Sequence, residues 1–283
     1  MSKKMKKAIR FLLIIIIIIS GLYTAYSYYR EQVDDVVYEN VDIYIEDVGI
    51  DVTLPEGEKK IPVLELDIEL IKSYQIEYDW DSLLAQNKDI IGWLYVPDNE
   101  YINFPVVKGT NNSYYLNHDY TRAWNANGAA FTDYRFDGLD LCRVIYGHNM
   151  NRDSRMPMFT SIKYWLEEDY FNSHRIIYYT HANGKTIKYL VFAVGGFNVY
   201  DKEFDYLQTF FETEDELQIW LEKLQTYCTF YDLDGRTVDY RADEIMVLST
   251  CDRHVGFGSN GRRVLFCLNL SNNEVNLDGV ELP

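Results

Sequence analysis

Short apolar runs separated by polar turns follow one another from residue 89 to residue 270. The runs are rich in β-branched and aromatic residues, and their length and composition are typical of β-strands. Asn183-Gly184 lies between two of them and is a strong hairpin signal. Pro105 interrupts another run and predicts a sheet edge or a bend there. The predicted strands cover residues 90–96, 102–107, 129–133, 143–146, 176–180, 185–194, 245–250 and 263–270.

Helical patterns interrupt this series of strands. Residues 79–86 predict a short helix, and residues 112–118 predict a helical turn. Thr213-Glu-Asp-Glu216 is a capping box, in which a Thr hydroxyl and a Glu three residues later satisfy backbone amides at a helix start. A mostly antiparallel barrel with a few inserted helices fits this order of elements. After the capping box, apolar residues recur at helical spacing, which indicates core packing and not a cofactor site: Leu217, Trp220, Leu221, Leu224 and Cys228.

The N-terminus combines a basic cluster with a long apolar run. Residues 11–29 are predominantly apolar and about as long as the ~20 residues that a helix needs to cross hydrocarbon. Because basic residues stay on the cytoplasmic side, we expect a cytoplasmic N-terminus and an extracellular remainder. A cleaved signal peptide is the competing interpretation. No convincing small-x-small cleavage site precedes the tyrosines at the end of the run, so an uncleaved single-pass anchor in the cell membrane is favoured.

The chain divides into segments of different character. Residues 30–78 are acidic and irregular, although residues 41–48 partly alternate like a strand. We interpret residues 30–78 as a spacer that holds a folded domain away from the membrane. The predicted segments are a cytoplasmic basic tail at 1–10, a transmembrane signal anchor at 11–29, the acidic extracellular spacer at 30–78, a folded domain at 79–272 and a C-terminal tail at 273–283.

Composition narrows the classes of function. The 283-residue chain carries a formal net charge of −17, which argues against nucleic acid as a partner because phosphate binding needs clustered Lys and Arg. An even number of cysteines in an exported chain allows disulfides. However, Cys142 and Cys267 lie inside apolar runs, as buried thiols do, and Cys228 falls near the end of the predicted helix. Cys251 differs, because it ends a strand beside a polar loop.

Three kinds of chemically capable side chain lie at the ends of predicted strands. Cys251 and His148 each end an apolar run, and Arg262 and Arg263 open the run that follows Cys251. A neutral thiol attacks amides poorly and needs a nearby base. An imidazole can accept the thiol proton and later protonate a leaving amine, and a guanidinium can stabilise an oxyanion. The combination indicates acyl transfer through a thioester.

Local sequence motifs make the predicted function more specific. The chain resembles the sortases, which are membrane-anchored cysteine transpeptidases of Gram-positive bacteria, and it looks most like class B. The resemblance extends from about residue 80 to residue 270, and the capped helix is similar to the added helix of class B. Its motifs occur in the expected order at residues 89–97, 102–109, 112–119, 128–135, 145–150, 248–251 and 261–262.

The resemblance implies a fold, a reaction and a set of site residues. The fold is mainly β, an eight-stranded sortase-type β-barrel with inserted helices, preceded by one N-terminal transmembrane helix, and residues 79–272 are its catalytic domain. The family's nucleophile, histidine and arginine correspond to Cys251, His148 and Arg262. The family cleaves a C-terminal sorting signal after Thr through a thioacyl intermediate and needs no cofactor. We expect the substrate groove to include Tyr146, Asn149, Ser249, Thr250 and Asp252.

Some assignments stay open at this stage. Neighbouring residues of a strand face opposite sides, so only one of Arg262 and Arg263 can face Cys251, and alignment with the family pattern favours Arg262. His254 is an alternative base, ranked below His148 because His148 lies in the more specific motif. The acidic residues 167–169 are an alternative calcium site, but such runs are more often a solvated surface.

The partners implied by the resemblance are surface proteins that carry a sorting signal and an amine acceptor. The acceptor is a cell-wall precursor such as lipid II or a peptidoglycan cross-bridge, so the expected outcome is attachment of surface proteins to peptidoglycan. Pilin polymerisation and simple hydrolysis are alternatives that differ only in the acceptor. A catalytically inactive barrel that binds surface ligands is a third, which the presence of Cys251, His148 and Arg262 disfavours.

Overall fold

The computed structural model describes residues 15–26, 28–29, 45–47, 76–99, 101–150, 158–252 and 256–270. The chain forms two compact units, residues 1–40 and residues 41–283. In the first unit, residues 15–26 and 28–29 are helical and exposed. Residues 11–14 and 27 of the predicted anchor lie outside the described residues, and no described helix meets the length and hydropathy that a membrane span requires. The anchor therefore stays a prediction.

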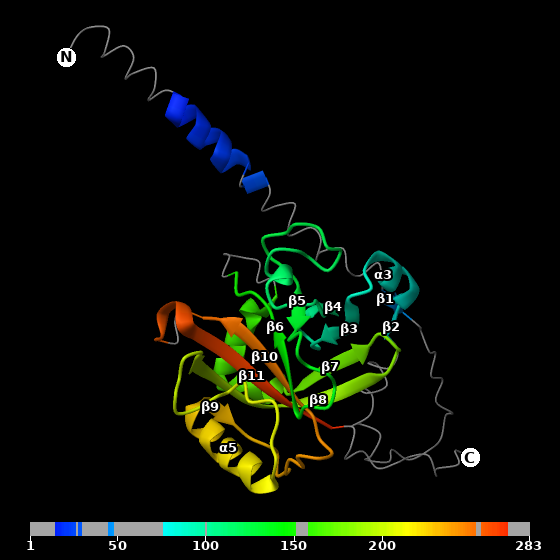
Figure 1. Ribbon diagram of the computed structural model, residues 1–283, viewed down its shortest axis with the longest axis vertical. Coiled ribbons are helices and arrows are strands. Elements are labelled where there is room, and N and C mark those ends of the chain that lie inside the picture. Colours follow the sequence, from blue (N-terminus) through cyan, green and yellow to red (C-terminus); the bar gives the residue numbers. More distant parts are fainter. Residues whose placement is uncertain are drawn as a thin grey trace, which may run out of the picture. The chain divides into compact units, whose positions relative to one another are not determined.

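A closed β-barrel forms the second unit, as predicted (Figure 1). Eight strands follow one another in the order β11-β10-β6-β5-β4-β3-β7-β8, and pairing of β11 with β8 closes the barrel. Neighbours are antiparallel except for β4 with β5 and β6 with β10. The bounds are β3 (Ile90–Tyr95), β4 (Asn103–Val107), β5 (Ala130–Thr132), β6 (Cys142–Tyr146), β7 (Ile176–His181), β8 (Thr186–Asn198), β10 (Ile245–Cys251) and β11 (Gly261–Asn269).

The local signals that predicted turns and edges correspond to observed features. Gly184 has a φ of 85° in the turn between β7 and β8, a conformation that suits glycine in a tight hairpin. Pro105 lies in β4, and β5 pairs only with Val106 and Val107 of that strand. Pro105 therefore has a paired neighbour only in β3, where it lies opposite Trp93. Its other side is not paired, as at a sheet edge, and a residue without an N–H is tolerated at such a position.

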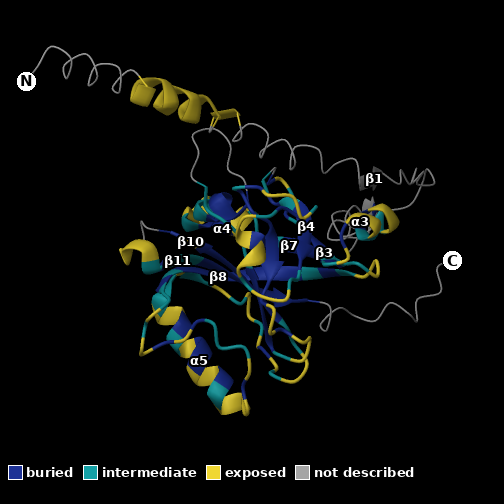
Figure 2. Ribbon diagram, turned by 45° about the horizontal axis from the view of Figure 1, so that its top comes forward, coloured by how far each residue is buried: buried dark blue, intermediate teal, exposed yellow. Residues whose placement is uncertain are grey.

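The capped helix α5 (Glu214–Tyr227) covers one face of the barrel. The Thr213 hydroxyl accepts a hydrogen bond from the Glu216 amide at 3.2 Å, as the capping box predicts. The Glu216 carboxylate accepts from the Glu212 amide at 2.9 Å, one residue before the expected partner. Figure 2 shows α5 with buried and exposed positions along its length. Its buried residues pack with side chains of β8, β10 and β11 in one core cluster: Leu217, Trp220, Leu221 and Leu224.

Several elements escaped the sequence analysis. Cys228 follows α5 but opens a further strand, β9 (Cys228–Tyr231), which pairs with β8 outside the barrel closure. The helices η4 (Phe159–Leu166) and α4 (Glu168–Ser173) were not predicted. Strand β2 (Ile76–Tyr78) and the helix η6 (Gly258–Asn260) were not predicted either. Three smaller elements do fall where the pattern indicated them: β1 (Ile45–Asp47), which pairs with β2, α3 (Trp80–Gln86) and η3 (Tyr114–Leu116).

Candidate active site

The register of β10 and β11 places Cys251 directly opposite Arg262. Directly opposed residues of an antiparallel pair have their side chains on the same face of the sheet. Arg263 is opposite Thr250 and faces the other way, where its Nε and Nη2 donate to Asp252 Oδ2 at 2.9 and 2.6 Å. The structure therefore presents Arg262, not Arg263, on the side of the thiol.

Strand β6 brings His148 to the same end of the sheet. β6 runs parallel to β10, and the last paired residues are Tyr146 and Ser249. Gly147 continues the contact by donating its amide to the Ser249 carbonyl at 3.2 Å. His148 and Cys251 each lie two positions beyond the last pair, so parallel strand order carries both side chains to one edge of the barrel.

The backbone of η3 fixes the histidine ring. His148 Nε2 is 2.7 Å from the Leu116 carbonyl oxygen. A carbonyl only accepts, so Nε2 carries the proton and Nδ1 holds the lone pair when the ring is neutral. Gly128, with a φ of 63°, packs behind this contact: an added Cβ would lie 2.5 Å from the Tyr115 carbonyl oxygen and 3.1 Å from His148 Cδ2. A glycine at 128 therefore lets the chain approach the histidine closely.

The three candidate catalytic side chains line one pocket of about 240 Å³. Tyr146, Ser249 and Thr250 of the predicted substrate groove also line it, whereas Asn149 and Asp252 are not among its lining residues. Sequence reasoning did not assign a site role to seven further lining residues. Four of them fall in the motifs at residues 112–119, 128–135 and 145–150, namely Asn112, Leu116, Phe131 and Gly147. The other three had no signal in the pattern: Val199, Tyr206 and Leu207.

A network behind the pocket fixes Tyr146. The Tyr146 hydroxyl donates to Asp133 Oδ2 at 3.1 Å. Burial opposes ionisation of Asp133, but hydrogen bonds from Arg135 and Asn112 outweigh it and hold the pKa of this carboxyl well below its ordinary value. Burial, reinforced by the negative charge of Asp133, raises the pKa of Tyr146. The phenol therefore stays neutral and remains a hydrogen-bond donor at neutral pH.

Three further groups of the pocket are polar and largely buried, namely Tyr206, Ser249 and Thr250. Burial also raises the pKa of Tyr206, whose hydroxyl lies 3.5 Å from Ser249 Oγ. Thr250 Oγ1 is buried and has no hydrogen-bond partner among the described residues. Arg262 Nη1 donates to the carbonyls of Ser259 and Gly261 at 3.1 and 2.8 Å, and Arg262 forms no ion pair within the described ranges. The guanidinium is thus oriented by backbone while its charge is not neutralised by a described carboxylate.

The four cysteines are free thiols, and only Cys251 is exposed. Burial raises the pKa of Cys228 to about 12 and raises the pKa of Cys142 and Cys267 further above the ordinary range. These three thiols are poor nucleophiles, because the thiolate is the reactive form and their raised pKa values keep them protonated. Cys251 is therefore the thiol that the structure offers to a substrate.

Other histidines occupy different surroundings. His118 stacks on Tyr114 and His174 stacks on Tyr170, with ring centroids 4.0 and 3.7 Å apart. Burial lowers the pKa of His181 to about 4. None of these histidines lines the pocket of Cys251, and His254 lies outside the described residues. Glu167, Glu168 and Asp169 are exposed, and no group of potential metal ligands occurs within the described part of the chain.

The barrel and the pocket define a class of protein. A strand-end cysteine beside a strand-end histidine and an arginine, on a closed eight-stranded barrel, is the arrangement of a sortase-type cysteine transpeptidase. No family model matches the chain. Among curated proteins, sortase B of Listeria monocytogenes is 32% identical over 186 residues, which covers 63% of this chain and 69% of that protein.

Solved structures agree with this relationship. A mutant form of Clostridium perfringens sortase B superposes with a TM-score of 0.59 at 28% identity, covering 68% of this chain and 86% of that one. The substrate complex of Staphylococcus aureus sortase B gives a TM-score of 0.56 at 26% identity, covering 68% and 83%. The chain belongs to the class B sortase family and is a cysteine transpeptidase.

Proposed function

We propose that Cys251 is the nucleophile, His148 the proton carrier and Arg262 the cation that stabilises the oxyanion. The observation that carries this assignment is the convergence of the three side chains on one pocket from β10, the end of β6 and β11. Cys251 is exposed whereas the other three thiols are less accessible, and this difference supports its role as the nucleophile. The cross-strand position of Arg262 supports its role over that of Arg263.

In the first half of the reaction, the Cys251 sulfur attacks the carbonyl carbon of a substrate Thr. The thiol proton passes to His148, whose Nδ1 is the acceptor because Nε2 is bonded to the Leu116 carbonyl. The tetrahedral oxyanion is stabilised by the guanidinium of Arg262. As the C–N bond breaks, His148 protonates the leaving amine, and a thioester remains on Cys251.

In the second half, an acceptor amine replaces the leaving group. Its nitrogen attacks the thioester carbon, and His148 removes one proton from that nitrogen as the C–N bond forms. The C–S bond then breaks, and the sulfur recovers the proton from His148. Water in place of the amine gives hydrolysis by the same steps. The identity of the nucleophile that reaches the pocket therefore decides between transfer and hydrolysis.

The proposed substrates are surface proteins with a C-terminal sorting signal that is cleaved after Thr. The proposed acceptor is the amine of lipid II or of a peptidoglycan cross-bridge, which would attach the protein to peptidoglycan. Residues 11–29 serve as a signal anchor in the cell membrane, with residues 1–10 cytoplasmic and the domain at 79–272 on the cell-wall side. The basic cluster before the apolar run supports this orientation, and the acidic segment 30–78 would act as the spacer.

A peptide-cleavage assay tests the proposal. The full chain is incubated with a panel of Thr-containing sorting-signal peptides, with triglycine, a lysine peptide or a lipid II mimic as the amine. We expect cleavage after Thr and a new amide with one amine class. Cys251→Ala and His148→Ala should abolish cleavage, whereas Cys228→Ala, which changes a cysteine outside the pocket, should retain it. Full activity of folded Cys251→Ala would overturn the assignment.

A further inference from the structure

A second hollow lies apart from the pocket of Cys251. It has a volume of about 400 Å³, within the roughly 300–1,000 Å³ of small-ligand sites. It is bounded by the connection between β3 and β4 and by η4 and α4, and it shares no lining residue with the Cys251 pocket. Its lining is Tyr95, Val96, Asp98, Asn99, Tyr101, Asn103, Tyr164 and Tyr170.

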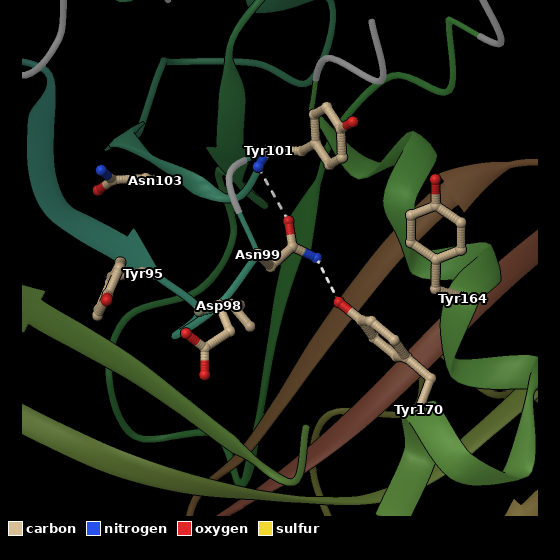
Figure 3. A pocket seen from close by; sticks show the side chains of 8 residues that line it. Tyr95, Asp98, Asn99, Tyr101, Asn103, Tyr164 and Tyr170 are labelled. Atoms are coloured by element: carbon tan, nitrogen blue, oxygen red, sulfur yellow. Dashed lines mark hydrogen bonds between the residues drawn. The ribbon is translucent and has the colours of Figure 1, made fainter. Parts of the chain in front are cut away.

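Tyrosine rings form much of its wall, and contacts within the fold fix their orientation. The rings of Tyr164 and Tyr170 lie 5.5 Å apart at 46°. Tyr170 is further held by the stacked ring of His174 and by Trp165, whose ring meets it edge-on at 5.0 Å. In the view of Figure 3, Tyr164 and Tyr170 lie on one side, Asp98 lies toward Tyr95, and Asn99 lies between Tyr101 and Tyr170. The aromatic wall is therefore in place before a ligand arrives.

Asn99 joins the β3–β4 connection to α4. Its Oδ1 accepts from the backbone amides of Tyr101 and Ile102 at 3.0 and 3.1 Å, and its Nδ2 donates to the Tyr170 hydroxyl at 2.9 Å (Figure 3). The hydrogen-bonding groups of Asn99 are thus largely used within the protein. Its role is to hold the turn that carries Asp98 against the tyrosine wall.

Three other polar groups remain available to a ligand. The Asp98 carboxylate is exposed and has no hydrogen-bond or ion-pair partner among the described residues. Asn103 uses Oδ1 to accept from Trp93 Nε1 at 2.8 Å, so its Nδ2 remains a donor. The Tyr170 hydroxyl accepts from Asn99, and burial raises the pKa of Tyr170, so it keeps a proton to donate. The hollow thus offers one charged acceptor and two donors beside aromatic faces.

We propose that this hollow binds a saccharide. Sugar hydroxyls donate and accept at the same time, so they can satisfy both Asp98 and the donors on Asn103 and Tyr170. The C–H faces of a sugar ring carry partial positive charge and complement the negative faces of tyrosine rings. An ammonium group only donates and would leave both donors without an acceptor. The described lining contains no Lys or Arg, which disfavours an anion.

The inference does not depend on the proposed transpeptidase roles, since the hollow contains none of those residues. Binding is measured by isothermal titration of the purified full chain, kept in solution with a detergent that has no sugar headgroup. One arm uses an N-acetylglucosamine oligomer and another uses a glucose oligomer, which separates amide-bearing wall glycans from neutral hexose polymers. Saturable binding of either oligomer is expected, and Cys251→Ala should bind equally well.

Matched variants locate the site. Asp98→Asn replaces a charged acceptor with a neutral one and should weaken binding roughly threefold to tenfold, because charge-assisted hydrogen bonds are about twice as strong. Asp234→Asn is its control, because both aspartates are exposed and have nearly equal positive φ, 57° and 55°. Tyr164→Leu should also weaken binding, whereas Tyr200→Leu, at an exposed tyrosine outside the hollow, should leave it unchanged.

Three results would overturn the proposal. The first is the absence of binding to both oligomers by the folded chain. The second is saccharide binding that Asp98→Asn and Tyr164→Leu leave unchanged, which would put the site elsewhere. The third is saturable binding of tetramethylammonium, lost in Asp98→Asn, without binding of either oligomer, which would make the hollow a cation site.

Discussion

Arg262 and Arg263 are adjacent in β11 but face opposite sides of the sheet, so their removal should have different consequences. Arg262 lines the pocket with Cys251 and is hydrogen-bonded to backbone carbonyls only. Arg263 forms an ion pair with Asp252, and the two side chains are 11% and 5% exposed. Arg262→Ala should therefore impair catalysis with little loss of stability, and Arg263→Ala should do the reverse.

The expected magnitudes follow from these surroundings. Removing one donor to a tetrahedral oxyanion typically lowers activity roughly 100- to 1,000-fold, so a loss of this size in kcat/KM is expected for Arg262→Ala. Removing Arg263 leaves the buried Asp252 carboxylate without its cation, a change that typically costs about 3–5 kcal/mol. That is a large part of the ~5–15 kcal/mol by which domains are stable. Removing Asp252 as well should recover part of the loss, because the buried carboxylate that lost its cation is then removed too.

Two assays separate the effects. Urea unfolding followed by circular dichroism gives the free energy of unfolding for each single variant and for Arg263→Ala combined with Asp252→Ala. Peptide cleavage at a temperature where each variant is folded gives kcat/KM. If Arg263→Ala loses as much kcat/KM as Arg262→Ala without losing stability, the assignment of the two arginines to opposite faces is refuted.

Three further predictions follow from the pocket and its support. Gly128→Ala, whose Cβ would collide with the Tyr115 carbonyl and with the Leu116 carbonyl that holds the histidine, should lower both stability and kcat/KM. Unchanged values of both would contradict the packing argument. Iodoacetamide should alkylate Cys251 before the other three cysteines in the native chain, as peptide mapping would show. Equal labelling would argue against the lower accessibility of those three thiols. Because the folded pKa of Asp133 is depressed, its stabilising contribution is fully present above the unfolded value of 3.8 and is lost progressively as pH falls from there through the lower folded pKa. Asp133→Asn should therefore reduce the free energy of unfolding at pH 7 and reduce it by less at pH 3. An equal reduction at both pH values would refute the stated direction of the pH dependence.

Most barrel strands could be predicted because each is a short apolar run in the sequence with turn residues next to it. The hairpin at Asn183-Gly184 and the cap at Thr213 depend on neighbouring residues only, and both appear where expected. Strand β9 was missed because Cys228 continues the apolar spacing of α5, and the change to extended structure depends on pairing with β8.

The site was only partly predictable, because it too depends on strand pairing and on contacts between residues distant in the sequence. Cys251, His148 and Arg262 stand out as chemically capable residues at strand ends, but the choice of Arg262 over Arg263 needed the register of β10 with β11. Pocket residues such as Val199 and Leu207 follow β8 in a loop, where no periodic pattern marks them. The hollow beside α4 combines residues more than sixty positions apart in the sequence, such as Asn99 and Tyr170, so local patterns carry no sign of it.

The most direct test of the central claim is the intact mass of the full chain after brief reaction with a sorting-signal peptide that it cleaves. The account predicts a mass increase equal to the acyl part of the peptide, mapped to Cys251, which disappears when the acceptor amine is added as the transferred product forms. Cleavage and transfer without any adduct on Cys251, or an adduct on another residue, would contradict the proposed mechanism.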